Sequence, residues 1–305
     1  MGKQALTCAV LAGALFATMG ALVKLTTGRM PTEMAVFLRN LFGLAMLTPW
    51  MLRLGAPGLK TQRYGGHLVR AVFGLTAMYC FFYTFHHLPL AQAMLLNYSA
   101  PVFLPIIAYL WLKERPGAAV YPAALIGLAG VALVLNASTI GLSSVAGIVG
   151  LASGIFAALA MAGVRRITNT EPTSRIVFYL TLHGAVLSGI PMLWRWQNPT
   201  GLDVLIMLGA GVSATLGQLF LTRAYSLGSA AQIAPLTYTT VVFAAIWGWL
   251  LWDEALSSSF AFGALLIAIG GTLALRASPK PAPIPEELLP EELLDADLIH
   301  GRHGD

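Results

Sequence analysis

Residues 91–114, AQAMLLNYSAPVFLPIIAYLWLKE, recur 140 positions further along the chain as residues 231–254, AQIAPLTYTTVVFAAIWGWLLWDE. The two stretches carry the same three polar residue types at equivalent positions: Gln92 and Gln232, Tyr98 and Tyr238, and Glu114 and Glu254. Apolar matches arise easily in a hydrophobic chain, but polar residues that recur at one offset indicate a duplicated unit. We therefore expect two copies of one structural repeat.

The duplication extends well beyond this pair of stretches. An offset of 141 aligns Gly13 with Gly154 and Lys24 with Arg165. The expected units are residues 1–138 and residues 139–278. Nearly the whole chain before its last segment is thus accounted for by two copies.

Composition places these copies in a membrane. Of the 305 residues, 57% are apolar and 10% are charged, whereas an average soluble domain has about 45–50% apolar and about 25% charged residues. This scarcity of charge excludes an ordinary soluble enzyme, a disordered chain and a nucleic-acid-binding module. The chain divides instead into apolar runs of roughly 20 residues, the length that a helix needs to cross a bilayer. The ten runs are 5–24, 33–52, 67–87, 90–112, 117–135, 143–164, 174–194, 202–225, 229–252 and 257–276.

Each copy holds five runs, so the second copy enters the membrane from the side opposite to the first. The expected fold is an all-α integral membrane protein with ten transmembrane helices in an inverted 5+5 repeat, a design that many secondary transporters use. Fourteen of the 18 Lys and Arg residues fall on the cytoplasmic side if the N-terminus is inside, which orients both termini inward. Residues 279–305 hold seven acidic and two basic residues after a Pro-rich start. We expect a disordered cytoplasmic tail there, with a partner-binding peptide as the alternative.

Short motifs add a resemblance to a known family. Residues 89–91 (PLA) open the fourth run, residues 111–115 (WLKER) close it, and residues 39–43 (RNLFG) and 67–70 (HLVR) belong to the second and third runs. These motifs and the ten runs resemble the EamA-type transporters of the drug/metabolite transporter superfamily. Within it they resemble the metabolite-permease branch, which includes S-adenosylmethionine and riboflavin carriers. The resemblance implies a transporter of a small metabolite and covers the ten runs without the tail.

Polar residues near prolines mark the expected substrate cavity. Pro101 has no N–H to donate, so the carbonyl of Asn97 loses its helical partner. Irregular backbone at membrane depth is tolerated only against protein or a wet cavity. The expected cavity residues are Arg39, Gln92, Asn97, Tyr98, Ser99, Gln218, Gln232, Thr237 and Tyr238, and the expected helix kinks are at Pro101, Pro105 and Pro235. The alternative is that these hydroxyls and amides hold packed helices together.

Arg39 is the charge that the loops do not explain. It lies about 9 Å below the end of its run at 1.5 Å per residue. It either attracts an anionic group in the cavity, with Glu33 or Lys24 as neighbours, or extends to the lipid interface.

Four further residues are candidates for gating or coupling. Glu114 and Glu254 end equivalent runs, where a carboxylate acts either as a helix cap and loop clamp or as a gate. Glu33 and His183 are candidates for proton coupling, with a satisfied core histidine as the other interpretation of His183.

The sequence favours a secondary transporter that moves a small polar or amphipathic metabolite across the cytoplasmic (inner) membrane by alternating access around a midplane cavity. A flippase for a lipid-linked intermediate is one alternative. A membrane-embedded enzyme is another, but the runs contain no convergent acid, base or metal set. We expect no catalytic residue, cofactor, metal or nucleic-acid partner. Protons are the candidate coupling ion, and the choice between monomer and homodimer stays open.

Overall fold

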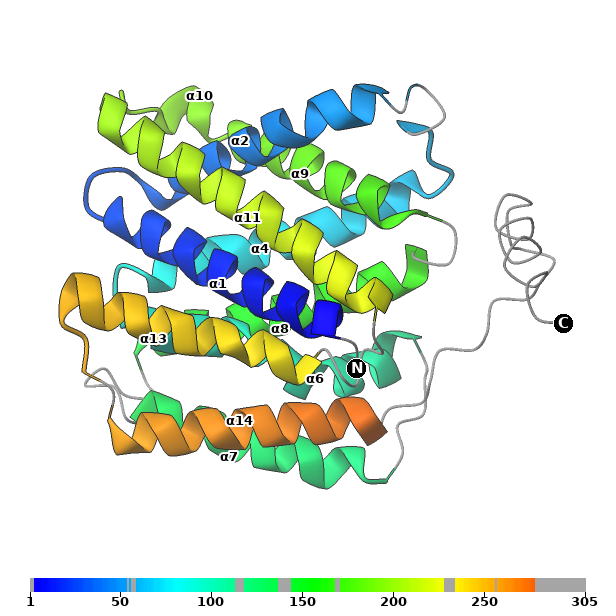
Figure 1. Cartoon of the computed structure of the whole chain (residues 1–305), viewed down its shortest axis with the longest axis vertical. Coiled ribbons are helices and arrows are strands. Elements are labelled where there is room, and N and C mark those ends of the chain that lie inside the picture. The colour runs from blue at the N-terminus through cyan, green and yellow to red at the C-terminus, as the bar shows by residue number, and fades with distance from the viewer. Residues whose placement is uncertain are drawn as a thin grey trace, which may run out of the picture.

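Figure 1 shows the computed structural model of the chain, in which the described residues are 3–53, 55, 59–112, 118–136, 144–167, 171–227, 234–255 and 257–277. Every regular element within these ranges is a helix. The first half contains α1 (Lys3–Leu25), α2 (Thr32–Arg53), α4 (Tyr64–Thr84), α5 (Leu90–Asn97), α6 (Ala100–Ile107), the π-helical turn η1 (Ala108–Leu112) and α7 (Val120–Asn136). The second half contains α8 (Val145–Ile167), α9 (Thr173–Gly189), α10 (Met192–Arg195), α11 (Gly201–Leu227), the 3-10 helix η2 (Ala234–Tyr238), α13 (Thr239–Trp252) and α14 (Ser258–Ala277).

The long helices lie side by side in a stack that runs from α2 and α9 at one end to α7 and α14 at the other (Figure 1). α1 packs against α11 and α13, and α8 packs against α4 and α6. The pairs α2 with α9 and α7 with α14 complete the stack. Each half therefore places its first long helix among helices of the other half. The start of α1 and the end of α14 lie on the same side of the molecule (Figure 1).

Three of the ten expected runs are interrupted in the structure, and two of them are the runs for which kinks were expected at Pro101, Pro105 and Pro235. Run 90–112 breaks at Tyr98 and Ser99, where the Ser99 hydroxyl donates to the carbonyl of Leu96 at 2.6 Å. Pro101 lies in the first turn of α6, a position at which its missing N–H costs little. Pro191 separates α9 from α10 in the same way in run 174–194. In run 229–252 the 3-10 helix η2, which contains Pro235, precedes α13, and Pro105 lies within α6 ahead of η1.

The outside of the bundle is apolar and its interior holds polar residues. Leu125 and Phe262 are about two-thirds exposed, whereas Arg39, Asn40 and His67 are buried. Extensive exposed apolar surface is typical of a protein that faces lipid. By length and composition alone, four of the described helices could cross a membrane: Lys3–Leu25, Thr32–Arg53, Val145–Gly163 and Gly201–Leu221.

Candidate functional site

Two of the three helix interruptions, between α5 and α6 and between η2 and α13, lie against a glycine from the other half of the chain. A methyl group on Gly154 of α8 would come within 2.5 Å of the Leu96 carbonyl oxygen and 2.6 Å of the Ser99 hydroxyl. A methyl group on Gly13 of α1 would collide in the same manner with the hydroxyl of Thr239 at the start of α13. Only glycine permits so close an approach without a shift of the helices. The two glycines are equivalent in the repeat, so the two junctions correspond to one another.

Four of the expected cavity residues lie at the first break. Gln92 on α5 is 8% exposed and Ser99 is fully buried. Asn97 and Tyr98 are half-buried. α5 packs against α8, α13 and α1, so these residues lie where helices of both halves meet.

The expected residues of the second half are more dispersed. The Tyr238 hydroxyl donates to the carbonyl of Ile267 at 3.3 Å, so this ring contacts α14 in the present conformation. Thr237 in η2 and Gln218 on α11 are half-buried. The hydroxyl of Thr240 is buried without a hydrogen-bond partner among the described residues. Two expected residues lie outside the described ranges: Gln232 and Glu114.

Arg39 is buried on α2 and lacks a counter-charge among the described residues. Its side chain is enclosed, with 6% of the residue exposed. One guanidinium nitrogen, Nη1, donates to Asn40 Oδ1 at 3.0 Å, and the Nε–H has no partner within the described part of the chain. None of the ion pairs in the described ranges includes Arg39. Asn40 in turn lies against Gly184 of α9, so the Arg39–Asn40 pair occupies the packing between α2 and the second half.

One end of the bundle is held by a buried ion pair. Lys24, at the end of α1, pairs with Glu254 and also donates to the Leu88 carbonyl at 3.1 Å. Its ammonium lies 4.9 Å from the ring centroid of Trp252. The other oxygen of Glu254 accepts from the backbone N–H of Leu90 at 2.7 Å. These five residues, the Lys24 cluster, join α1 and α13 to the start of α5.

Local backbone geometry makes room for the Glu254 carboxylate. Asp253 ends α13 in the left-handed region, at φ 54°, and so turns the chain back toward the helix. A methyl group on Gly248 would lie 2.5 Å from Glu254 Oε2. The carboxylate thus caps the positive end of α5, a helix of the other half of the chain, where the helix dipole favours negative charge.

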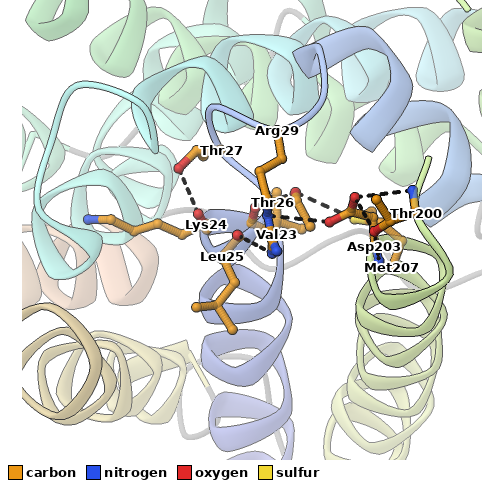
Figure 2. A network of polar contacts seen from close by, with 9 residues as sticks. All are labelled: Val23, Lys24, Leu25, Thr26, Thr27, Arg29, Thr200, Asp203 and Met207. Carbon is orange, nitrogen blue, oxygen red and sulfur yellow. Dashed lines mark hydrogen bonds and ion pairs between the residues drawn. The ribbon is translucent and has the colours of Figure 1, made fainter. Parts of the chain in front are cut away.

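A second contact joins the turn after α1 to α11 at the same end of the bundle (Figure 2). Arg29 Nε lies 3.3 Å from Asp203 Oδ1 in the first turn of α11. Asp203 and Thr200 cap that helix reciprocally, because the Thr200 hydroxyl accepts from the Asp203 N–H and Asp203 Oδ2 accepts from the Thr200 N–H. Figure 2 shows that the Lys24 side chain extends away from this contact. Lys24 and Arg29 therefore bind acids at two places in the second half, one just after α13 and one in the first turn of α11.

The remaining coupling candidates lie apart from the Lys24 cluster. His183 on α9 is 6% exposed, and its Nδ1–H donates to the Tyr179 carbonyl at 2.7 Å. Glu33 is half-buried in the first turn of α2.

The pairing of Lys24 with Glu254 was not expected from the sequence. The repeat nevertheless contained a signal for it. Lys24 aligns with the base Arg165, and Glu254 aligns with the acid Glu114. A base and an acid that both recur in a duplicated chain are candidates for one shared contact.

The fold and these buried polar contacts define an all-helical membrane protein, and comparison with known proteins identifies its family. The sequence profile of the EamA-like transporter family matches residues 3–136 and again residues 145–276. The chain belongs to this family, and thus to the drug/metabolite transporter superfamily, as the sequence motifs predicted. It is therefore a multi-pass membrane protein of a family that transports small metabolites.

Two relatives with named substrates are bacterial transporters. A pseudopaline exporter of Pseudomonas aeruginosa is 36% identical over 269 residues, which cover 88% of this chain and 94% of the relative. A riboflavin transporter of Vibrio cholerae is 25% identical over 245 residues, or 79% of this chain and 81% of the relative. A solved crystal structure superimposes with a TM-score of 0.63 at 22% identity and covers 91% of this chain and 98% of that one. This last similarity concerns the fold alone.

Proposed function

We propose that this protein is a secondary transporter that moves a small polar or amphipathic metabolite across the cytoplasmic membrane by alternating access. Residues 1–138 and 139–278 act as two inverted five-helix repeats with ten spans, both termini lie in the cytoplasm, and the substrate binds near the midplane between the repeats. The corresponding glycine junctions carry this proposal. Two interrupted helices that meet the first helix of the opposite repeat are what a carrier with a midplane site between repeats requires.

The charge on Arg39 favours a substrate that carries a carboxylate. A buried cation without a counter-charge is costly, since desolvation of an ion in a protein costs several kcal/mol. A bound anion offsets that cost and satisfies the unpartnered Nε–H with a charge-assisted hydrogen bond. Because a pseudopaline exporter is similar to this chain over most of its length, pseudopaline is the first compound to test.

In the proposed cycle the Lys24 cluster closes the outer end of the carrier. The asymmetry of Lys and Arg in the loops supports placing this end on the outer side. Glu254 then acts both as the cap of α5 and as part of a gate, because release of its bond to Lys24 removes the ion pair that joins the end of α1 to the end of α13.

Counterflow in proteoliposomes tests the proposed function. Vesicles that hold purified protein and excess unlabelled substrate are diluted into labelled pseudopaline, labelled riboflavin and a panel of carboxylated and neutral metabolites. We expect saturable, transient accumulation of at least one compound. Purified, folded protein that accumulates none of them, or flux that does not saturate, contradicts the proposal.

Arg39→Gln tests the role of the buried charge, with Arg53→Gln as the matched control because Arg53 is exposed at the end of the same helix. Loss of a charge-assisted hydrogen bond costs about 1.5–3 kcal/mol, so we expect the apparent affinity for a carboxylated substrate to fall by about 10- to 100-fold. Arg53→Gln should leave it unchanged. Equal affinities for the two variants contradict the assignment.

A further inference from the structure

His67 is a buried histidine whose ring nitrogens have no hydrogen-bond partner among the described residues. It lies in the first turn of α4 and is 1% exposed. Both Nδ1 and Nε2 are buried, and neither makes a hydrogen bond within the described ranges. A buried polar atom without a partner carries a desolvation cost of about 1–3 kcal/mol. The cost is removed if the ring gains a partner in another state of the protein.

The buried carboxylate of Glu171 lies close enough to His67 to become that partner. Glu171 Oε2 lies 3.8 Å from His67 Nε2, and both side chains are 1% exposed. Glu171 already accepts from the Thr61 hydroxyl at 2.6 Å, from the backbone N–H of Gln62 at 3.2 Å and from Arg175 at 2.7 Å. It therefore binds the segment before α4 to the start of α9.

Glu171 is held in its charged form by these partners. Burial by itself raises the pKa of this carboxyl group, but the hydrogen bonds from Thr61 and Arg175 outweigh burial and lower the pKa below its ordinary value. A negative charge thus lies beside the His67 ring at neutral pH.

A second buried histidine is stacked into the same group. The ring of Tyr179 stacks on His67, with centroids 4.7 Å apart, and on His183, with centroids 5.6 Å apart. Tyr64 meets the His183 ring edge-on at 5.2 Å. Since His183 Nδ1 donates to the Tyr179 carbonyl, its Nε2 is the third buried histidine nitrogen without a hydrogen-bond partner among the described residues.

We propose that His67, with Glu171 as its counter-charge, is the proton-binding site that couples transport to the proton gradient. This inference rests on the proposed function and adds the coupling ion and its site. A proton bound at Nε2 turns the 3.8 Å approach into a charge-assisted contact between α4 and the carboxylate at the start of α9. Loss of the proton leaves α4 free of that contact, so protonation changes how firmly this end of the bundle is held.

Several influences act on a charge at the His67 ring. Burial is the largest and disfavours the charged ring, while Glu171 favours it. Arg70 on α4 and His183 and Arg175 on α9 also oppose it. Arg70 is engaged through Nη1 with the Ile176 carbonyl at 2.8 Å, and Arg175 with Glu171. Both arginines thus have acceptors of their own, and Glu171 Oε2, 3.8 Å from Nε2, can accept from a proton on that ring nitrogen.

Transport with and without a pH gradient tests this site. Proteoliposomes are assayed for counterflow at equal pH and for net accumulation driven by a one-unit pH difference, which supports about a tenfold substrate gradient per coupled proton. Wild-type protein should show both activities, and His67→Gln should keep counterflow but lose the pH-driven gradient. His87→Gln is the matched control, because His87 lies in the exposed turn that follows the same helix, and it should behave like wild type. His67→Gln that still accumulates substrate in response to the pH gradient overturns the proposal.

A second measurement needs no variant. Substrate is added to wild-type protein in detergent at low buffer capacity, and proton uptake or release is followed with a pH dye. A coupled site must exchange protons on binding between about pH 5 and 8, where histidine titrates, and binding without proton exchange overturns the proposal. If wild-type protein shows counterflow but neither pH response, only the coupling site is wrong. If it shows no counterflow at all, the proposed function itself is wrong.

Discussion

Replacing Lys24 by Met leaves Glu254 buried without its counter-charge. The two side chains are 9% and 15% exposed, so solvent screens their interaction weakly. Loss of one partner of a buried pair costs about 3–5 kcal/mol, because the remaining charge is uncompensated. The Leu90 N–H still stabilises the carboxylate, so we expect about 3 kcal/mol, at the lower end of that range.

The double variant Lys24→Met/Glu254→Gln should be far milder than the single one. The new glutamine side chain would retain an oxygen that accepts from the Leu90 N–H, and the new methionine fits the apolar surroundings beside Trp252. Replacement of both charges of a buried pair is often close to neutral. The coupling free energy in a double-mutant cycle should therefore be at least about 2 kcal/mol.

The assay is the free energy of unfolding in detergent for wild type, both single variants and the double variant. Arg53→Met is the control, and as a surface substitution it should stay within about 0.5 kcal/mol of wild type. Leu88→Cys, introduced into each variant, reports on opening of the same end through its rate of thiol labelling. A shift of about 3 kcal/mol in the open–closed equilibrium raises the open population by roughly a hundredfold. A coupling energy below about 0.5 kcal/mol, together with unchanged labelling, refutes the role assigned to this pair.

Three further predictions follow from local contacts. Gly154→Ala should destabilise the protein by about 1–3 kcal/mol through overpacking and should slow transport. Gly65→Ala is the control and should do neither, because no atom lies within 4 Å of the added methyl group. Denaturation and counterflow measurements on both variants check this. Thr200→Ala removes the cap of α11 and should cost about 1 kcal/mol of unfolding free energy. Because the pKa of Glu171 is lowered in the folded protein, its charge contributes stability that is fully present above about pH 4.5 and is lost as the pH falls through the folded-state pKa. Thermal unfolding measured from about pH 7 downward should therefore show a fall in the unfolding temperature that Glu171→Gln lacks.

The helical architecture followed from the sequence because membrane helices are long, apolar and separated by short loops. Each of the ten expected runs overlaps helix in the structure, within a few residues at most ends. The interruptions were harder to predict. Pro101 indicated the approximate position of the interruption in run 90–112. The turn itself lies at Tyr98 and Ser99, because a proline is tolerated in the first turn of the helix that follows.

The polar contacts could be predicted only in part. The repeat showed that Gly13 and Gly154 occupy equivalent positions. The atoms that each glycine contacts could not be predicted, because they depend on the packing of α1 among helices of the second half and of α8 among helices of the first half. Lys24 and Glu254 are 230 residues apart, and no local pattern joins them. The burial of His67 was also missed, since a histidine at the start of an apolar run reads equally well as a residue at the membrane surface.

The contacts at the two ends of the bundle differ in a way that suits coupled transport. At one end, Lys24 binds Glu254 of the second half, and a lysine–carboxylate pair ordinarily carries both charges at neutral pH. At the other end, Glu171 of the second half faces His67 of the first half, and histidine is the side chain that ordinarily changes charge between about pH 5 and 8. A carrier must open its ends one at a time, so the relative strength of the two contacts determines which end opens. A proton that strengthens only the His67 contact shifts that balance, and a carrier with two permanent ion pairs would lack this dependence on pH.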